Sequence, residues 1–346
     1  MKLALCPMAT LSHEALRVLI HRWGDPDEYF SEMIHAPAFL AGGRFEQWYV
    51  RTAPCPERMV WQLTGNTPEP MIKAAEMLVP YGGIGIDLNM GCSAPDIAKT
   101  GAGIAWMSKP LSEVAKLVSG VRRGIDQKAC DIASTANIDG SESLLGSAGN
   151  ARFRLSVKLR LGEEENYVRL IEFCRMLVDE GAELITLHPR VRRGTYSRPA
   201  KREIVARLAT DVRVPVYGNG DVSSPEDALG FISCYPCSGL MVGRSAVQKP
   251  WIFGGIRKLE KGNRSGFPEA IDHLEVARSF LEHLAICQPP EFQLTRAHRF
   301  FFYYCNNFSF AHHIKMKIQN AKTIDAILPL FEEYFTAMPD DQYLLK

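Results

Sequence analysis

Short apolar runs recur along the first three-quarters of the chain, each bounded by glycine, proline or charged residues. Runs of this length, rich in Val, Ile, Leu and aromatic residues, are typical of buried strands. We predict eight strands, at Lys2–Cys6, Glu28–Ile34, Met59–Thr64, Ile84–Leu88, Leu155–Leu159, Leu184–His188, Val214–Gly218 and Gly239–Val242.

Helical patterns lie between these runs. Ile72, Ala75 and Leu78 repeat at helical spacing after the third run, and Ser224-Pro225 is a typical helix start after the seventh. Strands that alternate with helices over about 255 residues favour a (β/α)8 TIM barrel of the α/β class. A doubly wound open sheet is the rival architecture, and the length and the strand count favour the barrel.

Two segments fall outside the alternation. Residues 126–152 are rich in Ser, Ala and Gly and lack periodicity, which indicates a flexible insertion between a helix and a strand. Beyond Trp251 the strand signals cease. We therefore predict a barrel domain at 1–255 and a small all-helical C-terminal domain at 256–346, whose apolar positions include Leu274, Ala277, Phe280, Leu281 and Leu284.

Composition narrows the class of protein only slightly. The chain of 346 residues is 46% hydrophobic with a net charge of +1, so the total neither suggests nor excludes an anionic partner. Nine cysteines show no disulfide framework, and the one C-x-x-C, Cys234 and Cys237, lacks the second pair that a zinc site needs. No signal peptide or membrane-length apolar run is evident. We expect a soluble, cytoplasmic, metal-free protein and no more than a monomer.

Polar and reactive residues gather where the predicted strands end. Barrel enzymes place their chemistry at the carboxyl ends of strands, whereas the fold itself requires no such concentration. This pattern predicts an active site built from CPMA (6–9), QLTGN (62–66), NMGC (89–92), KLR (158–160), HPR (188–190), GNGD (218–221) and GR (243–244).

Several of these residues suggest chemistry that the pattern alone leaves open. The glycines of GNGD and Gly243-Arg244 favour a phosphate site after the last two strands, because exposed backbone N–H groups and a guanidinium bind anions. Lys158 suits either a Schiff base or a charge held against an electron-rich ring. His188 is equally a ligand contact or a core histidine, and Gln62 either faces a cofactor or packs against a neighbouring strand.

In their order and spacing, the motifs CPMA, QLTGN, DLNMGC, SVKLRLG, ITLHPR, VYGNGD and MVGRSAVQKPWIF resemble those of the tRNA-dihydrouridine synthases. The resemblance runs from the first strand to about Phe253 and extends in kind to the helical tail. It implies an FMN-bearing barrel with a helical RNA-binding domain, which uses NADPH to reduce particular uridines of tRNA.

The resemblance also assigns site residues. It places Gln62 at the edge of the isoalloxazine and Lys158 at its N1–O2 region. It implies that Asn89 contacts the uracil or the flavin. The remaining residues that it places against FMN, including its phosphate, are Pro7, Met8, Ala9, His188, Asn219, Gly220, Asp221, Gly243 and Arg244.

The resemblance implies that Cys92 is the catalytic residue. Reduction of the C5–C6 bond needs a hydride at C6, which the flavin supplies, and a proton at C5, for which Cys92 is the donor. A thiol suits this role because its ordinary pKa of about 8.5 leaves it mostly protonated at neutral pH. Ser93 stands where the family usually has proline, so the loop that carries Cys92 departs from the pattern.

Local charge supports an RNA partner. Residues 189–202 carry six Arg or Lys and no acid, and Arg190, Arg192 and Arg193 begin this stretch beside the predicted site. Such a rim binds phosphates, and a uridine within folded tRNA has to be extruded to reach a flavin. Residues 292–322 are also basic and contain FFFYY, for which a helix core is favoured over a base-stacking platform.

Two other classes of function remain open on the residues. One is a barrel lyase or aldolase that uses a Lys158 Schiff base on a sugar phosphate, which leaves Cys92 and the basic tail without roles. The other is a non-catalytic RNA-binding barrel, which Ser93 allows but the complete set of cofactor-facing residues disfavours.

Overall fold

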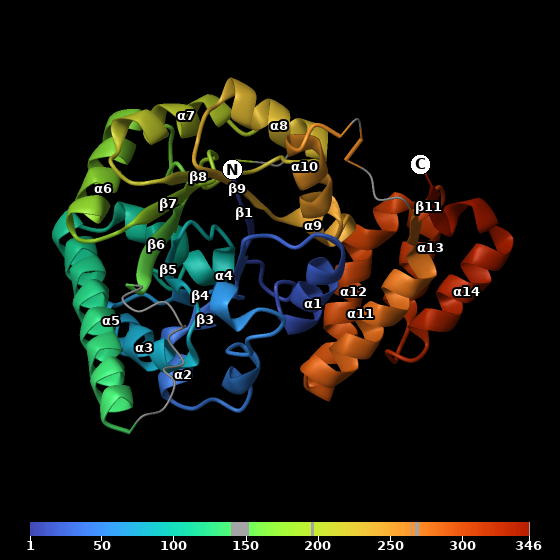
Figure 1. Cartoon of the computed structure of the whole chain (residues 1–346), viewed down its shortest axis with the longest axis horizontal. Coiled ribbons are helices and arrows are strands. Elements are labelled where there is room, and N and C mark those ends of the chain that lie inside the picture. The colour runs from blue at the N-terminus through green and yellow to red at the C-terminus, as the bar shows by residue number, and fades with distance from the viewer. Residues whose placement is uncertain (140–151, 195–196, 264, 267–269, 346) are drawn as a thin grey trace.

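The computed structural model describes residues 1–139, 152–194, 197–263, 265–266 and 270–345. Its centre is a parallel sheet in the order β2-β1-β9-β8-β7-β6-β5-β4-β3, and a further pairing of β2 with β4 closes it into a barrel (Figure 1). The strands are β1 (Lys2–Leu5), β2 (Glu28–Phe30), β3 (Ile34–His35), β4 (Met59–Thr64), β5 (Gly85–Met90), β6 (Arg154–Leu159), β7 (Leu184–Leu187), β8 (Val216–Asn219) and β9 (Gly239–Val242).

The prediction of a TIM barrel is therefore confirmed, with one local difference. The run predicted as a single strand at 28–34 is divided into β2 and β3, which together occupy one of the eight positions around the barrel. Ser31 lies at the break, where its hydroxyl accepts a hydrogen bond from the backbone N–H of Gln62 at 3.0 Å. A side chain thus replaces a bond of the strand ladder, and the strand is interrupted.

Helices surround the barrel on its outer side (Figure 1). Local signals explain several starts: Ser224, for example, accepts a hydrogen bond from the N–H of Asp227 at 3.1 Å, and Pro225 follows at the first helical position. These helices are α1 (Glu14–Trp23), α2 (Ala36–Leu40), α3 (Pro68–Leu78), α4 (Pro95–Ala98), α5 (Leu111–Asp139), α6 (Tyr167–Asp179), α7 (Arg202–Asp211), α8 (Pro225–Cys234), α9 (Arg244–Gln248) and α10 (Ile252–Glu260).

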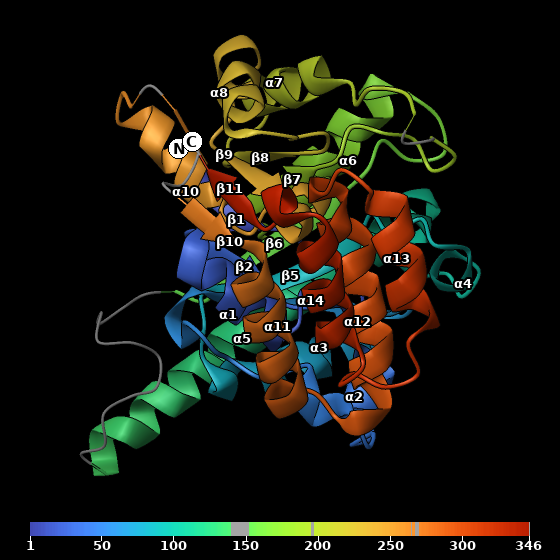
Figure 2. The same cartoon turned by 90° about the vertical axis from the view of Figure 1, so that its right-hand side faces the viewer.

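Helix α5 corrects the predicted insertion at 126–152. Residues 126–139 continue the helix instead of forming a loop, and the end of α5 projects beyond the barrel in Figure 2. Ala129 and Ile132 still pack on the core, and Gln127 donates to Asp131 one turn further on at 2.8 Å. The small and polar composition therefore does not prevent helix formation. The remainder of the predicted insertion, 140–151, lies outside the described residues.

The C-terminal region is helical, as predicted, and lies against one side of the barrel (Figure 1). Helix α11 packs on α1, and α12 packs on α9. A short antiparallel pair, β10 (Ala270–Asp272) with β11 (Tyr343–Leu345), is an addition to the all-helical expectation. The helices are α11 (His273–Cys287), α12 (Pro290–Tyr304), α13 (Ala311–Asn320) and α14 (Ile327–Ala337).

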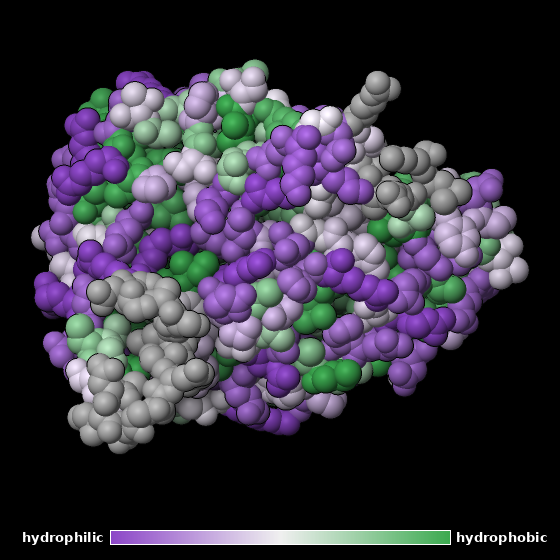
Figure 3. All heavy atoms as spheres, in the orientation of Figure 1, coloured by the Kyte–Doolittle hydropathy of each residue, from purple (hydrophilic) through white to green (hydrophobic). Residues whose placement is uncertain are grey.

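Hydrophobic side chains on the face seen in Figure 3 form small patches separated by hydrophilic ones. Within the part of the chain that the structure describes, no helix combines the length and the apolar character that crossing a membrane requires.

Candidate active site

A cavity of about 920 Å³ lies at the carboxyl ends of the barrel strands. This is within the range of pockets that hold cofactors and small ligands. Loops after β1, β5, β6, β7, β8 and β9 form most of its wall, and Met33, α12 of the helical region and Asn306 contribute the rest.

Twelve of the residues that the sequence analysis assigned to the site line this one cavity. They come from six strand ends that are widely separated in the sequence, so the barrel brings together what the pattern could only place at strand ends. They are Pro7, Met8, Ala9, Asn89, Cys92, Lys158, His188, Asn219, Gly220, Asp221, Gly243 and Arg244.

Cys92 is a partly buried residue of the cavity wall, and its backbone is held from both sides. Asn89 Oδ1 accepts a hydrogen bond from the N–H of Cys92 at 2.9 Å, and the Cys92 carbonyl accepts one from Ile104 at 2.9 Å. Gly103 lies so close that a Cβ there would be 2.5 Å from the Cys92 carbonyl oxygen. Only glycine fits, and the loop is positioned without the family's usual proline at Ser93.

Lys158 reaches across the barrel interior. Its Nζ donates to Asn219 Oδ1 at 3.0 Å, while Asn219 Nδ2 donates to the carbonyl of Met241 at 2.7 Å. Residues of three strands, β6, β8 and β9, therefore fix the ammonium at the cavity wall.

His188 is a neutral group in this site. Burial and then the nearby cations Lys158, Arg160, Arg190 and Arg244 lower its pKa to about 2. Arg190 Nη1 donates to His188 Nε2 at 2.9 Å, which places the imidazole proton on Nδ1. His188 is thus a hydrogen-bonding group, not a proton donor, at neutral pH.

Arg190 does not belong to the exposed basic rim in which it was predicted. Only 5% of the residue is exposed, and its Nη2 pairs with Asp221 Oδ2 at 2.6 Å. Asp221, next to Gly220 in the loop after β8, has a φ of 55° and also accepts from the N–H of Ala200 at 2.7 Å. Arg190 therefore lies beneath the cavity and supports its wall instead of facing solvent.

Three further predicted residues, Gln62, Arg192 and Arg193, do not line the cavity. Gln62 is fully buried and reaches the site only through Asn89, whose Nδ2 donates to Gln62 Oε1 at 2.9 Å. Arg192 forms an ion pair with Glu163 at 2.6 Å, and Arg193 is exposed. Gln62 therefore does not face the cavity itself, as the flavin contact expected of it would require.

Three residues of the helical region were missed by the sequence analysis. Arg299 and Tyr303 of α12, one helical turn apart, and Asn306 just beyond it line the same cavity. Arg299 lies over the Tyr303 ring, with its guanidinium carbon 5.3 Å from the centroid. The basic and aromatic composition of 292–322 signalled a role here, but only the packing of α12 on the barrel shows which side chains face the site.

The cavity suits an anionic cofactor. Lys158, Arg160 and Arg244 supply positive charge, and Gly220 and Gly243 leave room for a ligand against the backbone. A Cβ at Gly220 would meet His188 at 2.8 Å, and its φ of 122° excludes most other residues. Cationic donors beside bare backbone are the arrangement that binds phosphate in barrels.

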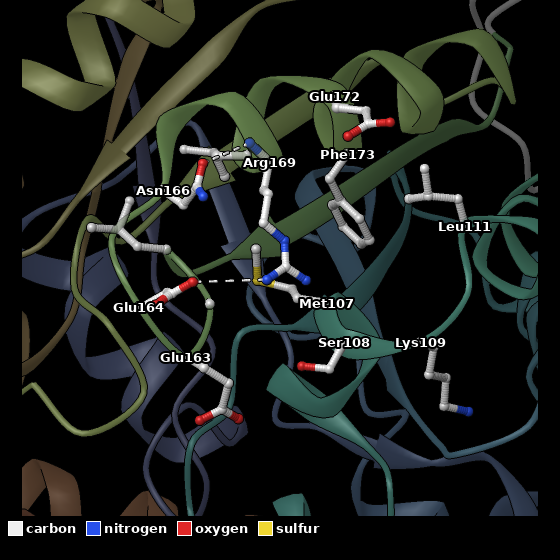
Figure 4. Close-up of a pocket in the computed structure, with 13 residues that line it drawn as sticks. Met107, Ser108, Lys109, Leu111, Glu163, Glu164, Asn166, Arg169, Glu172 and Phe173 are labelled. Atoms are coloured by element: carbon white, nitrogen blue, oxygen red, sulfur yellow. Dashed lines mark hydrogen bonds and ion pairs between the residues drawn. The ribbon is translucent and has the colours of Figure 1, made fainter.

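A second, smaller pocket of about 210 Å³ lies between the loop after β6, α6 and the start of α5. Figure 4 shows Arg169 of α6 reaching toward Glu164, with Phe173 beside them. None of the predicted site residues lines this pocket. In the described residues, no group of three or more His, Cys, Asp or Glu could hold a metal ion.

A closed (β/α)8 barrel with a thiol, a lysine and further cations lining one cavity at its carboxyl end is typical of a barrel enzyme. Residues 3–138 and 147–337 match the family model described as dihydrouridine synthase (Dus), so the chain belongs to that family and is an oxidoreductase.

Individual relatives agree with the family. The chain is 31% identical to a protein of Treponema pallidum named "Probable tRNA-dihydrouridine synthase", over 73% of this chain and 69% of that one. It is 26% identical to tRNA-dihydrouridine synthase B of Xanthomonas campestris, over 97% and 93% of the two chains. A solved structure of 2-naphthoyl-CoA reductase has a TM-score of 0.51 at 10% identity. That match covers 76% of this chain and 50% of the other, and it shows the shared fold alone.

Proposed function

We propose that this protein reduces the C5–C6 double bond of uridines in tRNA to give dihydrouridine, with FMN as its resident cofactor and NADPH as reductant. The names of its relatives support the substrate, and one relative, from Coprinopsis cinerea, is named as an NAD(P)(+) enzyme. That relative is 28% identical over 82% of this chain and 39% of its own length.

The observation that carries the proposal is the shared cavity. It brings the Cys92 loop, which follows β5, together with cations and glycine backbone from β6, β8 and β9. Lys158, Arg244 and the glycines at 220 and 243 would hold FMN, with His188 and Asn219 as further hydrogen-bonding groups. The chemistry that a bound FMN supplies is hydride transfer to C6 of the uracil.

Cys92 completes the reduction. As the C5–C6 π bond is broken and C6 gains the hydride, the Cys92 S–H bond breaks and its proton passes to C5. The thiolate that remains takes a proton from solvent before the next turnover. Asn89, which holds the backbone N–H of Cys92, keeps the thiol at the cavity wall.

The helical region, predicted from residue 256 onward, would bind the body of the tRNA. Arg299 and Tyr303 line the cavity from that side and would receive the extruded nucleotide, because aromatic and guanidinium planes stack on bases. Arg192 and Arg193 on the other side would contact phosphates.

Absorption spectra and a product assay on wild type and Cys92→Ala test the proposal together. We expect both proteins to show two flavin bands between about 300 and 550 nm that bleach with anaerobic NADPH. Wild type should form dihydrouridine in unmodified tRNA, and Cys92→Ala should lose it by at least about 100-fold. A colourless protein that FMN cannot reconstitute would overturn the cofactor, and full turnover by Cys92→Ala would remove the thiol from the chemistry.

A further inference from the structure

A buried chain of polar side chains runs beneath the cavity and ends at the backbone of Cys92. Gln62, Asp87 and Ser156 are register partners on β4, β5 and β6, and all three are fully buried. Gln62 Nε2 donates to Asp87 Oδ2 at 2.7 Å, and Ser156 Oγ donates to Asp87 Oδ1 at 2.7 Å. The proposed chemistry leaves Asp87 without a role, although an ionisable group is costly to bury.

The carboxylate of Asp87 determines which atom donates and which accepts in each hydrogen bond of this chain. A carboxylate only accepts, so the amide of Gln62 must turn its NH₂ toward Asp87 and its oxygen toward Asn89. Asn89 then donates from Nδ2 to Gln62 at 2.9 Å, which leaves its own oxygen facing the Cys92 loop. That oxygen accepts from the N–H groups of Cys92 at 2.9 Å and Gly91 at 3.3 Å.

If either amide were reversed, the Asn89 NH₂ would face two backbone N–H groups, and the loop would lose both hydrogen bonds. We propose that Asp87 is a positioning residue that sets the orientation of the Gln62 and Asn89 amides and thereby holds the Cys92 loop at the cavity wall. The inference rests on the proposed role of Cys92, which it deepens by naming what places the thiol.

The substitution Asp87→Asn distinguishes a role in positioning the Cys92 loop from a role in stabilising the fold. Burial raises the pKa of Asp87 to about 6, against hydrogen bonds from Gln62 and Ser156 and the charges of Lys158 and Arg154, which lower it. At pH 7.5 the ionised group is therefore a cost to folding, and Asp87→Asn should unfold at no lower temperature than wild type. The introduced amide can offer either its oxygen or its NH₂ to Gln62, so the direction of the chain is lost.

A double variant restores the direction. In Asp87→Asn with Gln62→Glu, the carboxylate at position 62 accepts from the introduced amide on one oxygen and from Asn89 Nδ2 on the other. The Asn89 oxygen again faces the loop. Ser156→Ala is the matched control, because it removes a hydrogen bond to the opposite oxygen of Asp87 and leaves the direction of the chain unchanged.

The purified enzymes are compared by the rate at which iodoacetamide alkylates Cys92, followed by peptide mass spectrometry, and by single-turnover oxidation of the reduced enzyme by tRNA. Asp87→Asn should alkylate about fivefold faster, as a loop without its hydrogen bonds exposes the thiol. Its single-turnover rate should also be about tenfold lower, because a displaced reacting group slows the chemical step. In the double variant, the alkylation rate and the single-turnover rate should both return most of the way to the wild-type values. In Ser156→Ala, both rates should stay within about threefold of wild type.

Wild-type alkylation and turnover in Asp87→Asn would overturn the inference, and so would a double variant no better than the single one. If wild type forms no dihydrouridine, the proposed function fails, yet the alkylation rates still decide whether Asp87 positions Cys92.

Discussion

At the scale of single residues, neighbours that carry no chemistry place the groups that do. Gly103 packs on Cys92: a Cβ at this position would lie 2.5 Å from the Cys92 carbonyl oxygen and 3.1 Å from the Cys92 Cβ, and the φ of Gly103 is 60°. Gly101, two residues earlier, has a φ of 84° but meets only Asn66, at 3.7 Å. An alanine at Gly101 would therefore introduce backbone strain alone. An alanine at Gly103 would introduce the same strain together with a clash against the Cys92 loop.

Gly103→Ala should displace Cys92, whereas Gly101→Ala should only destabilise the fold. Each substitution forces alanine to a positive φ, which costs about 1–2 kcal/mol of unfolding free energy. Gly103→Ala adds the clash, so we expect a further loss of about 1–3 kcal/mol and slower dihydrouridine formation. Urea unfolding and single-turnover rates measure the two effects. Equal behaviour of the two variants would show that the close approach to Cys92 is unimportant.

The sequence identified the residue types at the strand ends but not their partners. Parallel strands of a barrel end at one edge, so polar residues after each apolar run could be assigned to one site. Whether Arg190 points to solvent or to Asp221 depends on a loop that follows a different strand. The burial of Gln62 depends in the same way on Asp87 and Asn89. Such pairings are set by tertiary packing, which a local pattern does not contain.

At the scale of elements, α12 contributes side chains both to the core of the helical region and to the cavity. Phe300, Phe301 and Tyr304 are buried in the helical core, with Phe300 stacked on Phe280 at 3.8 Å between centroids. This confirms the core interpretation for three members of FFFYY. Tyr303 faces the cavity instead, and Phe302 is 47% exposed on another side of the helix. Helical periodicity alone could not tell which face would meet the barrel.

Tyr303→Ala should weaken tRNA binding, with Phe302→Ala as the matched control on the same helix. Loss of an aromatic face that stacks on a base costs about 1–3 kcal/mol of binding free energy. Phe302 does not line the cavity, and we expect its removal to cost less than about 0.5 kcal/mol. Filter binding at fixed salt measures both, with the flavin spectrum as a check on the site. A larger effect of Phe302→Ala would place the RNA on the outer face of α12.

At the scale of the whole molecule, one buried ion pair joins the helical region to the barrel and to the cavity. Arg296 of α12 donates to Glu32 Oε2 at 2.6 Å, and both side chains are almost fully buried. The other oxygen, Oε1, accepts from the N–H of Thr10 at 2.6 Å. Thr10 follows the cavity-lining Pro7–Ala9 and has a φ of 64°. Glu32 thus holds the loop after β1 and α12 at once.

Arg296→Met should therefore destabilise the protein and disturb its cofactor site together. Removing one partner leaves a buried carboxylate uncompensated, which costs about 3–5 kcal/mol of unfolding free energy. Arg278→Met, in an exposed pair with Glu332 of the same region, should cost no more than about 1 kcal/mol. Adding Glu32→Gln to Arg296→Met removes the stranded charge and keeps an acceptor for Thr10, so it should recover most of the loss. Urea unfolding and FMN titration test these expectations, and an Arg296→Met protein as stable as Arg278→Met would show that this ion pair does not hold the two regions together.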